Sequence, residues 1–303
     1  MIEITHKSST LRTATAEATV QVSSQATIDA IQNNKVAKGN VFEMSKTAGL
    51  FAVKRTSDII PDCHPLPIEY TGIEFEINGL EIKIKATIKT IYKTGVEVEA
   101  MHGASVVALT MYDMLKPIDK GIQINNIQLL HKKGGKSDFK DKYRSDINAV
   151  VIVCSDTIAA GQKEDKAGKA IITKLEASNV NVMDYIIVPD EIDDIRSLAL
   201  RLVEKNTDLI IFTGGTGLSK RDVTPEALAP ILDREIPGVT EAIRSYGQDR
   251  TPYSMLSRSV AGTKDESLII ALPGSTNGAK ESMDAIFPAI LHVFRIFKGA
   301  RHE

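Results

Sequence analysis

Tryptophan is absent from this chain, and aromatic residues make up only 5% of its 303 positions. Proteins that bind single-stranded nucleic acid stack bases on aromatic side chains, so this scarcity argues against that class. The formal net charge of -2 provides no global positive field to attract nucleic acid or an anionic membrane surface. We therefore expect no nucleic acid and no membrane among the partners of this protein.

Cysteine and long apolar segments are also scarce. The two cysteines, Cys63 and Cys154, lie far apart in the sequence, which indicates no disulfide framework and fits a reducing cytoplasm. No apolar run approaches the roughly 18 residues that a transmembrane helix needs. The first residues, from Met1 to Ile4, lack the basic start and apolar core of a signal peptide. The sequence therefore predicts a cytoplasmic protein.

The first 145 residues combine hairpin and helix patterns. Apolar and polar residues alternate through 72–94, and Asn78-Gly79 separates the two alternating runs, which is a strong signal for a β-hairpin. Helices are expected at about 25–33 and 100–116. Hairpins and helices without regular alternation between them predict an α+β domain with an antiparallel sheet.

The remaining residues follow a strand–loop–helix rhythm. Strands are expected at 148–154, 182–188, 208–213 and 267–272, with helices at about 164–177, 191–205 and 280–297. This rhythm predicts an α/β domain with a doubly wound, mostly parallel sheet. The polar segment 136–146 is the natural linker, so the predicted domains are 1–142 and 146–303.

Polar or glycine-rich residues follow each of the four expected strands in the second half. Ser155-Asp156 and Pro189-Asp190 follow the first two strands, and the loops 213–217 and 272–276 follow the others. Because ligands bind beyond the carboxyl ends of parallel strands, these residues predict a ligand site. Glycines in 213–217 would let backbone N–H groups approach a phosphate. The alternative is that these loops only turn the chain.

The residues after the 213–217 loop add a helix start and an acid. Thr224 is expected to cap a helix whose first residue is Pro225. Asp222 lies near that start, where it could hold Mg²⁺ bridging phosphates. A separate string, Gly134-Gly135-Lys136-Ser137, is not a phosphate-binding P-loop, because Leu130 stands where the earlier glycine is required.

The string TGGTGLSKRDVTPEA at 213–227 resembles the molybdopterin-binding family that includes molybdopterin adenylyltransferases. SD at 155–156, PDE at 189–191 and LPGS at 272–275 match in the same order, so the resemblance covers about 146–300. It implies adenylylation of molybdopterin with Mg²⁺ and ATP as cofactors and release of pyrophosphate. It also implies that Asp190 and Asp222 are catalytic acids and that Asp222 is the metal ligand. The residues that it places near phosphate, pterin or nucleotide are Ser155, Asp156, Gly214, Gly215, Thr216, Gly217 and Ser275.

A pterin-binding scaffold without catalytic activity is the alternative for this half. The intact acids Asp190 and Asp222 favour catalysis over the scaffold.

Charged side chains in the first half have simpler explanations when they are taken singly. Glu97 and Glu99 would project to one face if they end a strand. Asp113 and Lys116 would be neighbours on a helix, and such a pair is most often a plain surface ion pair. Cys63 and His64 could bind a metal ion, but no partner set with zinc spacing accompanies them.

Five strings in this half closely resemble cyclic pyranopterin monophosphate synthases: KGNVF, DIIPDCHPL, KTGVEVEA, ALTMYDMLK and LLHKKGGKSDF. The resemblance covers about 1–142. It implies a ferredoxin-like fold and conversion of 3′,8-cyclo-7,8-dihydro-GTP to cyclic pyranopterin monophosphate, with pyrophosphate leaving and no cofactor. The catalytic residues that it implies are Lys38, His64, Glu97, Glu99, Asp113 and Lys116, with Asp113 and Lys116 in proton transfer. The substrate-binding residues that it implies are Arg12, Cys63, Pro65, Met101 and Lys132. Glu3 stands where this family commonly has Asp.

Geometry and both resemblances bear on the assembly. A helix at 100–116 would place the Glu99 end and Asp113 roughly 20 Å apart at about 1.5 Å per residue. One compact pocket cannot easily use both from one subunit, so we expect a composite site at a subunit interface. The first family forms hexamers built from dimers and the second forms trimers, which implies a homo-oligomer, a hexamer, with pterin and nucleotide substrates. An RNA-binding ferredoxin-like domain is disfavoured because the aromatic pattern of such domains is missing.

Overall fold

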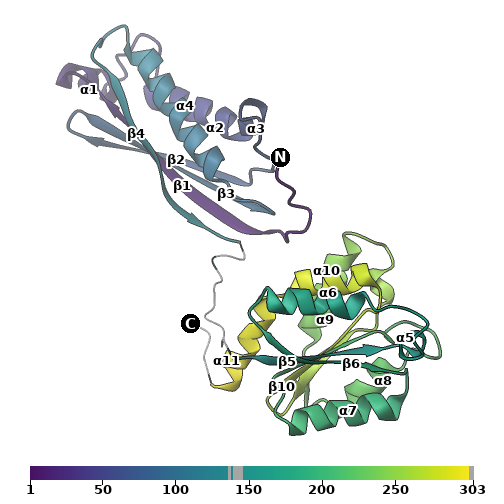
Figure 1. Ribbon diagram of the computed structural model, residues 1–303. Coiled ribbons are helices and arrows are strands. Elements are labelled where there is room, and N and C mark those ends of the chain that lie inside the picture. The colour runs from purple at the N-terminus through teal and green to yellow at the C-terminus, as the bar shows by residue number, and fades with distance from the viewer. Residues whose placement is uncertain (136–137, 139–145, 300–303) are drawn as a thin grey trace. The chain divides into compact units, whose positions relative to one another are not determined.

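The structure is a computed structural model that describes residues 1–135, 138 and 146–299. The chain divides into two compact units, Met1–Lys140 and Asp141–Glu303 (Figure 1). Each unit has its own sheet and its own hydrophobic core. The linker predicted at 136–146 lies outside the described residues except for positions 138 and 146.

The amino-terminal unit contains an antiparallel sheet with the strand order β2-β3-β1-β4. Its strands are Thr10–Gln21 (β1), Tyr70–Asn78 (β2), Glu81–Tyr92 (β3) and Gln123–Lys133 (β4). The predicted hairpin joins β2 to β3, and Gly79 turns the chain there with a φ of 62°. Glycine adopts this left-handed conformation without a steric penalty. The α+β class with an antiparallel sheet is confirmed.

Helices pack on this sheet within the described part of the unit. They are Gln25–Gln32 (α1), Val41–Lys54 (α2), Thr56–Ile59 (α3) and Glu97–Leu115 (α4). Figure 1 shows α2 and α4 together over one face of the sheet. They approach closely because Gly49 and Gly103 lie between them: ideal Cβ atoms there would lie 2.5 Å from Val107 and 2.6 Å from Val53. The two helices are therefore in close contact where they cross.

The carboxyl-terminal unit is built on a mostly parallel sheet with the order β6-β5-β7-β10-β9-β8. Its strands are Asn148–Cys154 (β5), Asn181–Val188 (β6), Leu209–Thr213 (β7), Arg234–Glu235 (β8), Val260–Lys264 (β9) and Ser267–Leu272 (β10). The first four strands in the order are parallel to one another. Strand β9 runs antiparallel to β10, and β8 runs antiparallel to β9. The mostly parallel sheet is confirmed, whereas β8 and β9 were not predicted.

Helices cover both faces of this sheet, as Figure 1 shows. One face carries Ala167–Glu176 (α6), Pro237–Gln248 (α9) and Thr276–Ile286 (α10), and the other carries Ile192–Glu204 (α7) and Thr224–Leu228 (α8). Short segments complete the unit: Asp156–Ala159 (α5), Val293–Phe297 (α11) and the 3₁₀ turns Ala229–Ile231 (η1), Ser254–Leu256 (η2) and Ala289–His292 (η3). Because both faces are covered, the central strands are continuously apolar.

The single helix expected at 280–297 is wrong. Helix α10 ends at Ile286, and the chain continues through Pro288 into η3 and α11. Proline has no backbone N–H, and its ring clashes with the preceding helical turn, so a helix breaks there. Among the described residues, no helix has both the length and the apolar character that crossing a membrane requires.

Candidate functional sites

The carboxyl end of α4 carries a cluster of two lysines around one carboxylate. Asp113 Oδ2 lies 2.6 Å from Lys38 Nζ, and Asp113 Oδ1 lies 2.7 Å from Lys116 Nζ. Lys38 also donates a hydrogen bond to the Asp113 carbonyl oxygen at 2.7 Å. A turn at Gly39, with a φ of 101°, positions Lys38 just before α2. The structure thus brings together three residues that come from two distant parts of the sequence.

The charges of this cluster are fixed by its hydrogen bonds. Hydrogen bonds from Lys116 and Lys38 lower the pKa of Asp113 to about 2, and their positive charges add to the effect. Asp113 in turn raises the pKa of Lys116 through its hydrogen bond and its negative charge. Near neutral pH the cluster therefore holds two ammonium groups and one carboxylate, which leaves a net positive charge for an anionic ligand.

The amino end of α4 carries the other two acids of this unit. The helix begins at Glu97, so Glu97 and Glu99 do not end a strand, and the condition for their sharing one face of a strand is not met. Residues two apart on a helix point to different sides. Glu97 Oε1 pairs with Lys132 Nζ at 2.8 Å, whereas Glu99 is only 3% exposed and accepts a hydrogen bond from Cys63 Sγ at 3.1 Å.

Burial controls the protonation of the pair formed by Glu99 and Cys63. Burial raises the pKa of Glu99, although the hydrogen bond from Cys63 opposes this shift. Burial and the nearby Glu99 carboxylate raise the pKa of the Cys63 thiol to about 12. Cys63 is therefore a neutral thiol near neutral pH, and it acts as a hydrogen-bond donor.

The remaining predicted residues of this unit contact backbone atoms or the core. His64 Nε2 lies 2.8 Å from the Ile2 carbonyl oxygen. Arg12 donates Nε to the Tyr92 carbonyl at 3.3 Å and Nη2 to the Lys93 carbonyl at 3.4 Å. Met101 packs on the hydrophobic core, and Pro65 is exposed.

Residues Glu99 and Asp113 lie on the same helix, roughly 20 Å apart at about 1.5 Å per residue. The predicted residues of the amino-terminal unit therefore form two groups, one at each end of α4.

In the carboxyl-terminal unit, the glycine-rich loops lie at the carboxyl ends of the parallel strands. Gly214 has a φ of 103° and Gly215 a φ of 61°. An added Cβ at Gly214 would lie 2.1 Å from the Cys154 carbonyl oxygen, so no larger residue fits there. An ideal Cβ at Gly274 would lie 2.9 Å from the Gly214 Cα. The loops 213–217 and 272–276 are thus in direct contact. This agrees with the prediction that the loops after the parallel strands lie at one edge of the sheet.

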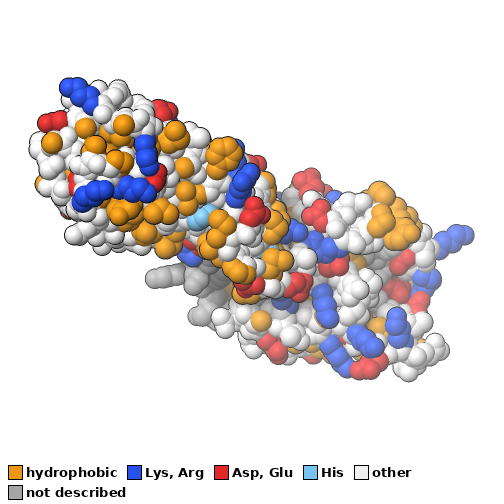
Figure 2. All heavy atoms as spheres, turned by 90° about the horizontal axis from the view of Figure 1, so that it is seen from above, with side chains coloured by type: hydrophobic (Ala, Val, Ile, Leu, Met, Phe, Trp, Pro, Cys, Tyr) orange, Lys and Arg blue, Asp and Glu red, His pale blue; other side chains and the backbone are white. Residues whose placement is uncertain are grey.

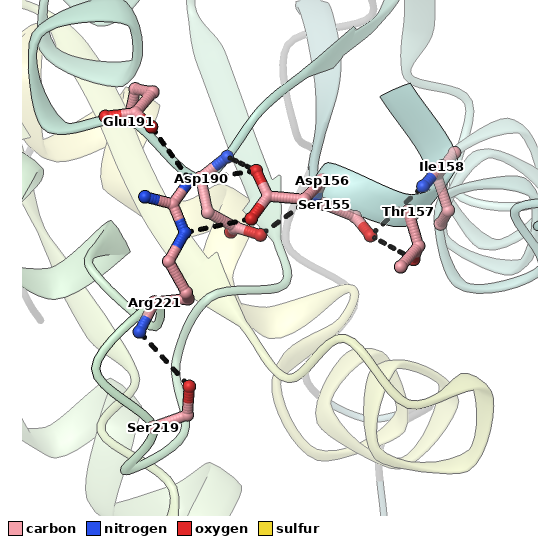
Figure 3. Close-up of polar contacts among 8 residues, drawn as sticks. All are labelled: Ser155, Asp156, Thr157, Ile158, Asp190, Glu191, Ser219 and Arg221. Atoms are coloured by element: carbon pink, nitrogen blue, oxygen red, sulfur yellow. Dashed lines mark hydrogen bonds and ion pairs between the residues drawn. The ribbon is translucent and has the colours of Figure 1, made fainter. Parts of the chain in front are cut away.

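The acids after β5 and β6 hold each other through their backbone. Asp156 N–H donates to Asp190 Oδ2 at 3.1 Å, and Asp190 N–H donates to Asp156 Oδ1 at 3.0 Å. Arg221 binds both oxygens of Asp156 and also pairs with Glu191 Oε1 at 2.8 Å. Figure 3 shows these contacts around the strand ends. Arg221 and Glu191 were missed in the sequence, although Arg221 directly precedes the predicted Asp222.

One oxygen of Asp190 has no hydrogen-bond partner. Asp190 Oδ1 is buried and unpartnered among the described residues, and it would lie 2.9 Å from an ideal Cβ at Gly215. Burial raises the pKa of Asp190, and the negative charges of Asp156 and Asp222 add to this effect. Asp222 lies across the loop, where its Oδ2 accepts a hydrogen bond from Ser219 N–H at 2.7 Å.

These carboxylates fit a magnesium ion that arrives with a nucleotide. Within the described residues, no group of three or more His, Cys, Asp or Glu side chains is arranged to hold a metal ion. Mg²⁺ in nucleotide sites typically uses one or two carboxylates and takes its other ligands from phosphates and water. The unpartnered oxygen of Asp190 beside the glycine loop is suited to that role.

Two other residues, Arg258 and Thr224, fix the loop between β7 and α8. Arg258 donates Nε to the Gly217 carbonyl at 2.8 Å and Nη2 to the Asp222 carbonyl at 2.6 Å. Thr224 was expected to cap a helix, and this is wrong: it is the first residue of the short α8, and its hydroxyl donates to the Gly214 carbonyl at 2.9 Å. Arg258 was also missed, because it is distant from the loop in sequence. Thr216 is buried within the loop.

Both predicted serines cap helices, and Ser275 also borders a cavity. Ser155 Oγ accepts a hydrogen bond from Ile158 N–H, and Ser275 Oγ accepts one from Gly278 N–H. Ser275 also lines a cavity of ≈ 550 Å³, together with Arg250 and Tyr253. Pockets of roughly 300–1,000 Å³ are typical of small-molecule sites. The geometry thus provides two glycine-rich loops in contact, a pair of acids and a cavity beside Ser275.

Comparison with known proteins gives a match for each half of the chain. Residues 1–135 match the MoaC family, and residues 150–292 match the family described as "Probable molybdopterin binding domain". A cyclic pyranopterin monophosphate synthase from Clostridium perfringens is 46% identical over 139 residues, which cover 45% of this chain and 87% of that protein.

Two relatives match the whole chain. A molybdenum cofactor biosynthesis bifunctional protein from Chlorobaculum tepidum is 38% identical over 302 residues, which cover 100% of this chain and 96% of the relative. Another protein of that name, from Synechococcus elongatus, is 35% identical over 315 residues, covering 100% of this chain and 98% of the relative.

Proposed function

The chain belongs to the family of bifunctional molybdenum cofactor biosynthesis proteins, and from that premise we propose that its two units catalyse separate reactions. The amino-terminal unit converts 3′,8-cyclo-7,8-dihydro-GTP to cyclic pyranopterin monophosphate and releases pyrophosphate. The carboxyl-terminal unit binds molybdopterin and transfers an adenylyl group to it from ATP. A ferredoxin-like amino-terminal fold belongs to the same proposal, and the strand order β2-β3-β1-β4 supports it.

The cluster of Lys38, Asp113 and Lys116 is the observation that carries the first reaction. A carboxylate with a pKa of about 2 is a poor proton acceptor near neutral pH, so Asp113 serves mainly to orient the two ammonium groups. Lys116, whose ammonium group Asp113 orients at 2.7 Å, acts as the proton donor in this proposal. Lys38, with Lys132 and His64, positions the phosphates and ribose.

A composite site at a subunit interface follows from the length of α4. The two groups of predicted residues lie at opposite ends of this helix, so we propose that each site uses the Glu99 end of one subunit and the Asp113 end of another. Met44, Phe51 and Leu109 are exposed on α2 and α4, and exposed apolar groups of this kind mark association surfaces. Figure 2 shows hydrophobic side chains among the charged ones on the face of this unit that it presents. A homo-oligomer, a hexamer that combines dimers and trimers, is the proposed assembly.

The unpartnered Asp190 oxygen beside the glycine loop is the observation that carries the second reaction. Backbone N–H groups of the 213–217 loop bind the phosphates of ATP. Asp190 and Asp222 would hold Mg²⁺, which would supply positive charge to neutralise the phosphates. The cavity beside Ser275 and Arg250 receives the pterin.

Each reaction has a direct assay with the purified chain. Incubation with 3′,8-cyclo-7,8-dihydro-GTP should yield cyclic pyranopterin monophosphate and pyrophosphate. Incubation with molybdopterin, ATP and Mg²⁺ should yield adenylylated molybdopterin and pyrophosphate. Binding of molybdopterin without any adenylylation would instead identify the second unit as a scaffold.

A further inference from the structure

Arg221 binds a carboxylate in the two-pronged manner that is specific to arginine. Its Nε donates to Asp156 Oδ2 at 2.9 Å, and its Nη2 donates to Asp156 Oδ1 at 3.0 Å. Nη2 also donates to Glu191 Oε1 at 2.8 Å. The guanidinium group is planar and presents two parallel N–H groups, whereas the ammonium group of lysine is a point charge. The contact therefore fixes the orientation of Asp156 as well as neutralising it (Figure 3).

Asp156 passes this orientation on to Asp190. Asp156 Oδ1, which Arg221 holds, also accepts the hydrogen bond from Asp190 N–H, and Asp156 N–H donates to Asp190 Oδ2. With Oδ2 engaged in this way, Asp190 Oδ1 lies toward Gly215, buried and without a partner among the described residues. The direction of that free oxygen thus depends on a contact chain that begins at the guanidinium group.

From this chain of contacts we infer that Arg221 is a positioning residue of the carboxyl-terminal site. It fixes Asp156, and Asp156 fixes the Asp190 oxygen that faces the glycine loop. This inference rests on the proposed function, because the oxygen matters only if it receives a cation with its nucleotide. The contrasting role for Arg221 is simple charge neutralisation of Asp156 and Glu191, which a lysine would perform equally well.

The substitution Arg221→Lys separates the two roles because it keeps the positive charge but removes the planar guanidinium group with its two parallel N–H donors. The measurement is calorimetric titration of the full-length protein with Mn²⁺ in the presence of α,β-methylene-ATP, which cannot be turned over. Loss of a group that orients a metal ligand typically weakens metal binding about 10- to 100-fold, and we expect a loss in that range. Unchanged binding in Arg221→Lys would overturn the inference.

Arg196→Lys is the matched control. Arg196 donates Nε to the Ala227 carbonyl and Nη2 to the Glu226 carbonyl, both at 3.3 Å. Neither of these contacts involves Asp156, Asp190, Glu191 or Asp222. Arg196→Lys should leave Mn²⁺ binding unchanged. This control shows whether replacing an arginine that contacts α8 affects binding in general. An equal loss in Arg196→Lys would contradict a specific positioning role for Arg221.

A double-variant cycle covers the case in which Arg221→Lys perturbs folding. In an Asp156→Ala background the contact chain is already broken, so adding Arg221→Lys should weaken binding no further. Additive losses would refute positioning through Asp156. If the wild-type protein binds no Mn²⁺ with the nucleotide analogue, the proposed function of the unit fails. If the wild-type protein binds Mn²⁺ and Arg221→Lys binds it equally well, only the positioning role of Arg221 fails.

Discussion

Asp119 is a buried carboxylate that holds the start of α1. It is 4% exposed and accepts hydrogen bonds from Ser23 N–H, the Ser23 hydroxyl, the Thr27 hydroxyl and Gly121 N–H. Burial alone would raise the pKa of Asp119, but these hydrogen bonds outweigh burial and lower it to about 2. The ionised side chain thus ties α1 to the segment before β4.

The substitution Asp119→Asn should destabilise the protein at neutral pH. A carboxyl pKa lowered from 3.8 to about 2 stabilises the folded state by about 2 kcal/mol above the unfolded pKa, and this contribution disappears as pH falls through about 2. Urea unfolding of wild type and Asp119→Asn should therefore differ at pH 7 and converge as the pH falls from about 4 to 2. Asp58→Asn, at an exposed position in α3, is the control. An equal difference at pH 7 and pH 2 would argue against this account.

The pairing of Cys63 with Glu99 predicts an unreactive thiol. The thiolate is the nucleophilic form, and the pKa of Cys63 is raised to about 12 by burial and by Glu99. Cys63 should therefore react slowly with N-ethylmaleimide at pH 7.5, and Glu99→Gln should speed the reaction because it removes the negative charge. Peptide mass spectrometry distinguishes Cys63 from the buried Cys154, which should stay unmodified in both proteins. Slower alkylation in Glu99→Gln would contradict the assigned contact.

At the scale of single residues, the sequence predicted positions along the chain better than the contacts of the side chains. The strand-end rule placed Asp190 near the loop, and the start of the following helix placed Asp222 there. The structure places both beside the 213–217 loop. The bond between Lys38 and Asp113 could not be predicted, because it depends on how the chain before α2 folds toward α4. Arg221 was missed because nothing in its neighbourhood shows that Asp156 lies opposite it.

At the scale of elements, the two helices over the amino-terminal sheet depend on glycine at their crossing. An added methyl group at Gly49 would lie 2.5 Å from Val107 Cγ2 and 2.7 Å from Ile73 Cδ1, so both side chains would have to move. Overpacking a core typically costs about 1–3 kcal/mol. By contrast, an ideal Cβ at Gly238, in α9, meets no atom within 4 Å.

The same substitution at these two glycines should therefore have opposite effects. Gly49→Ala should lower the free energy of unfolding by up to about 2 kcal/mol, because overpacking exceeds the roughly 1 kcal/mol that alanine gains over glycine in a helix. Gly238→Ala should leave stability unchanged or raise it by up to about 1 kcal/mol. Urea unfolding measures both changes. A destabilised Gly238→Ala, or a stabilised Gly49→Ala, would show that the helix packing described here is wrong.

Alternation and apolar runs predicted most of the strands but not all of them. The hairpin of β2 and β3 and the strands β5, β6, β7 and β10 carry clear patterns. Strand β1 was missed because its buried face is mostly alanine: Ala14, Ala16 and Ala18 precede Val20, and alanine is a good helix former. Its small side chains are buried only because α4 packs over them. Strand β4 was missed because most of its residues are exposed and its apolar residues do not alternate regularly with polar ones.

At the scale of the whole molecule, the length of α4 predicts that each synthase site combines residues of two subunits. The variants Asp113→Asn and Glu99→Gln should each lack synthase activity, since each removes one half of every composite site. Mixed oligomers of the two variants should recover about a quarter of wild-type activity. In random assembly, about a quarter of the sites combine an unaltered Glu99 end from one variant with an unaltered Asp113 end from the other. Steady-state assays of co-expressed, differently tagged chains measure this recovery.

A mixture altered at one end of α4 only is the control for this experiment. Asp113→Asn combined with Lys116→Met should recover no activity, because every site then has a damaged Asp113 end. No recovery with Asp113→Asn and Glu99→Gln would place the whole synthase site in one subunit. Recovery in the control would instead contradict the assignment of Asp113 and Lys116 to the same end of one site.

The central claim is that one chain contains two chemically independent sites, and assays of both reactions on the same two variants test it most directly. Asp113→Asn should lose cyclic pyranopterin monophosphate formation by at least about a hundredfold and retain adenylylation of molybdopterin, since proton-transfer machinery contributes factors of that size. Asp222→Asn should show the reverse pattern. If either substitution abolished both activities, or if neither affected its assigned reaction, the division of labour between the two units would be contradicted.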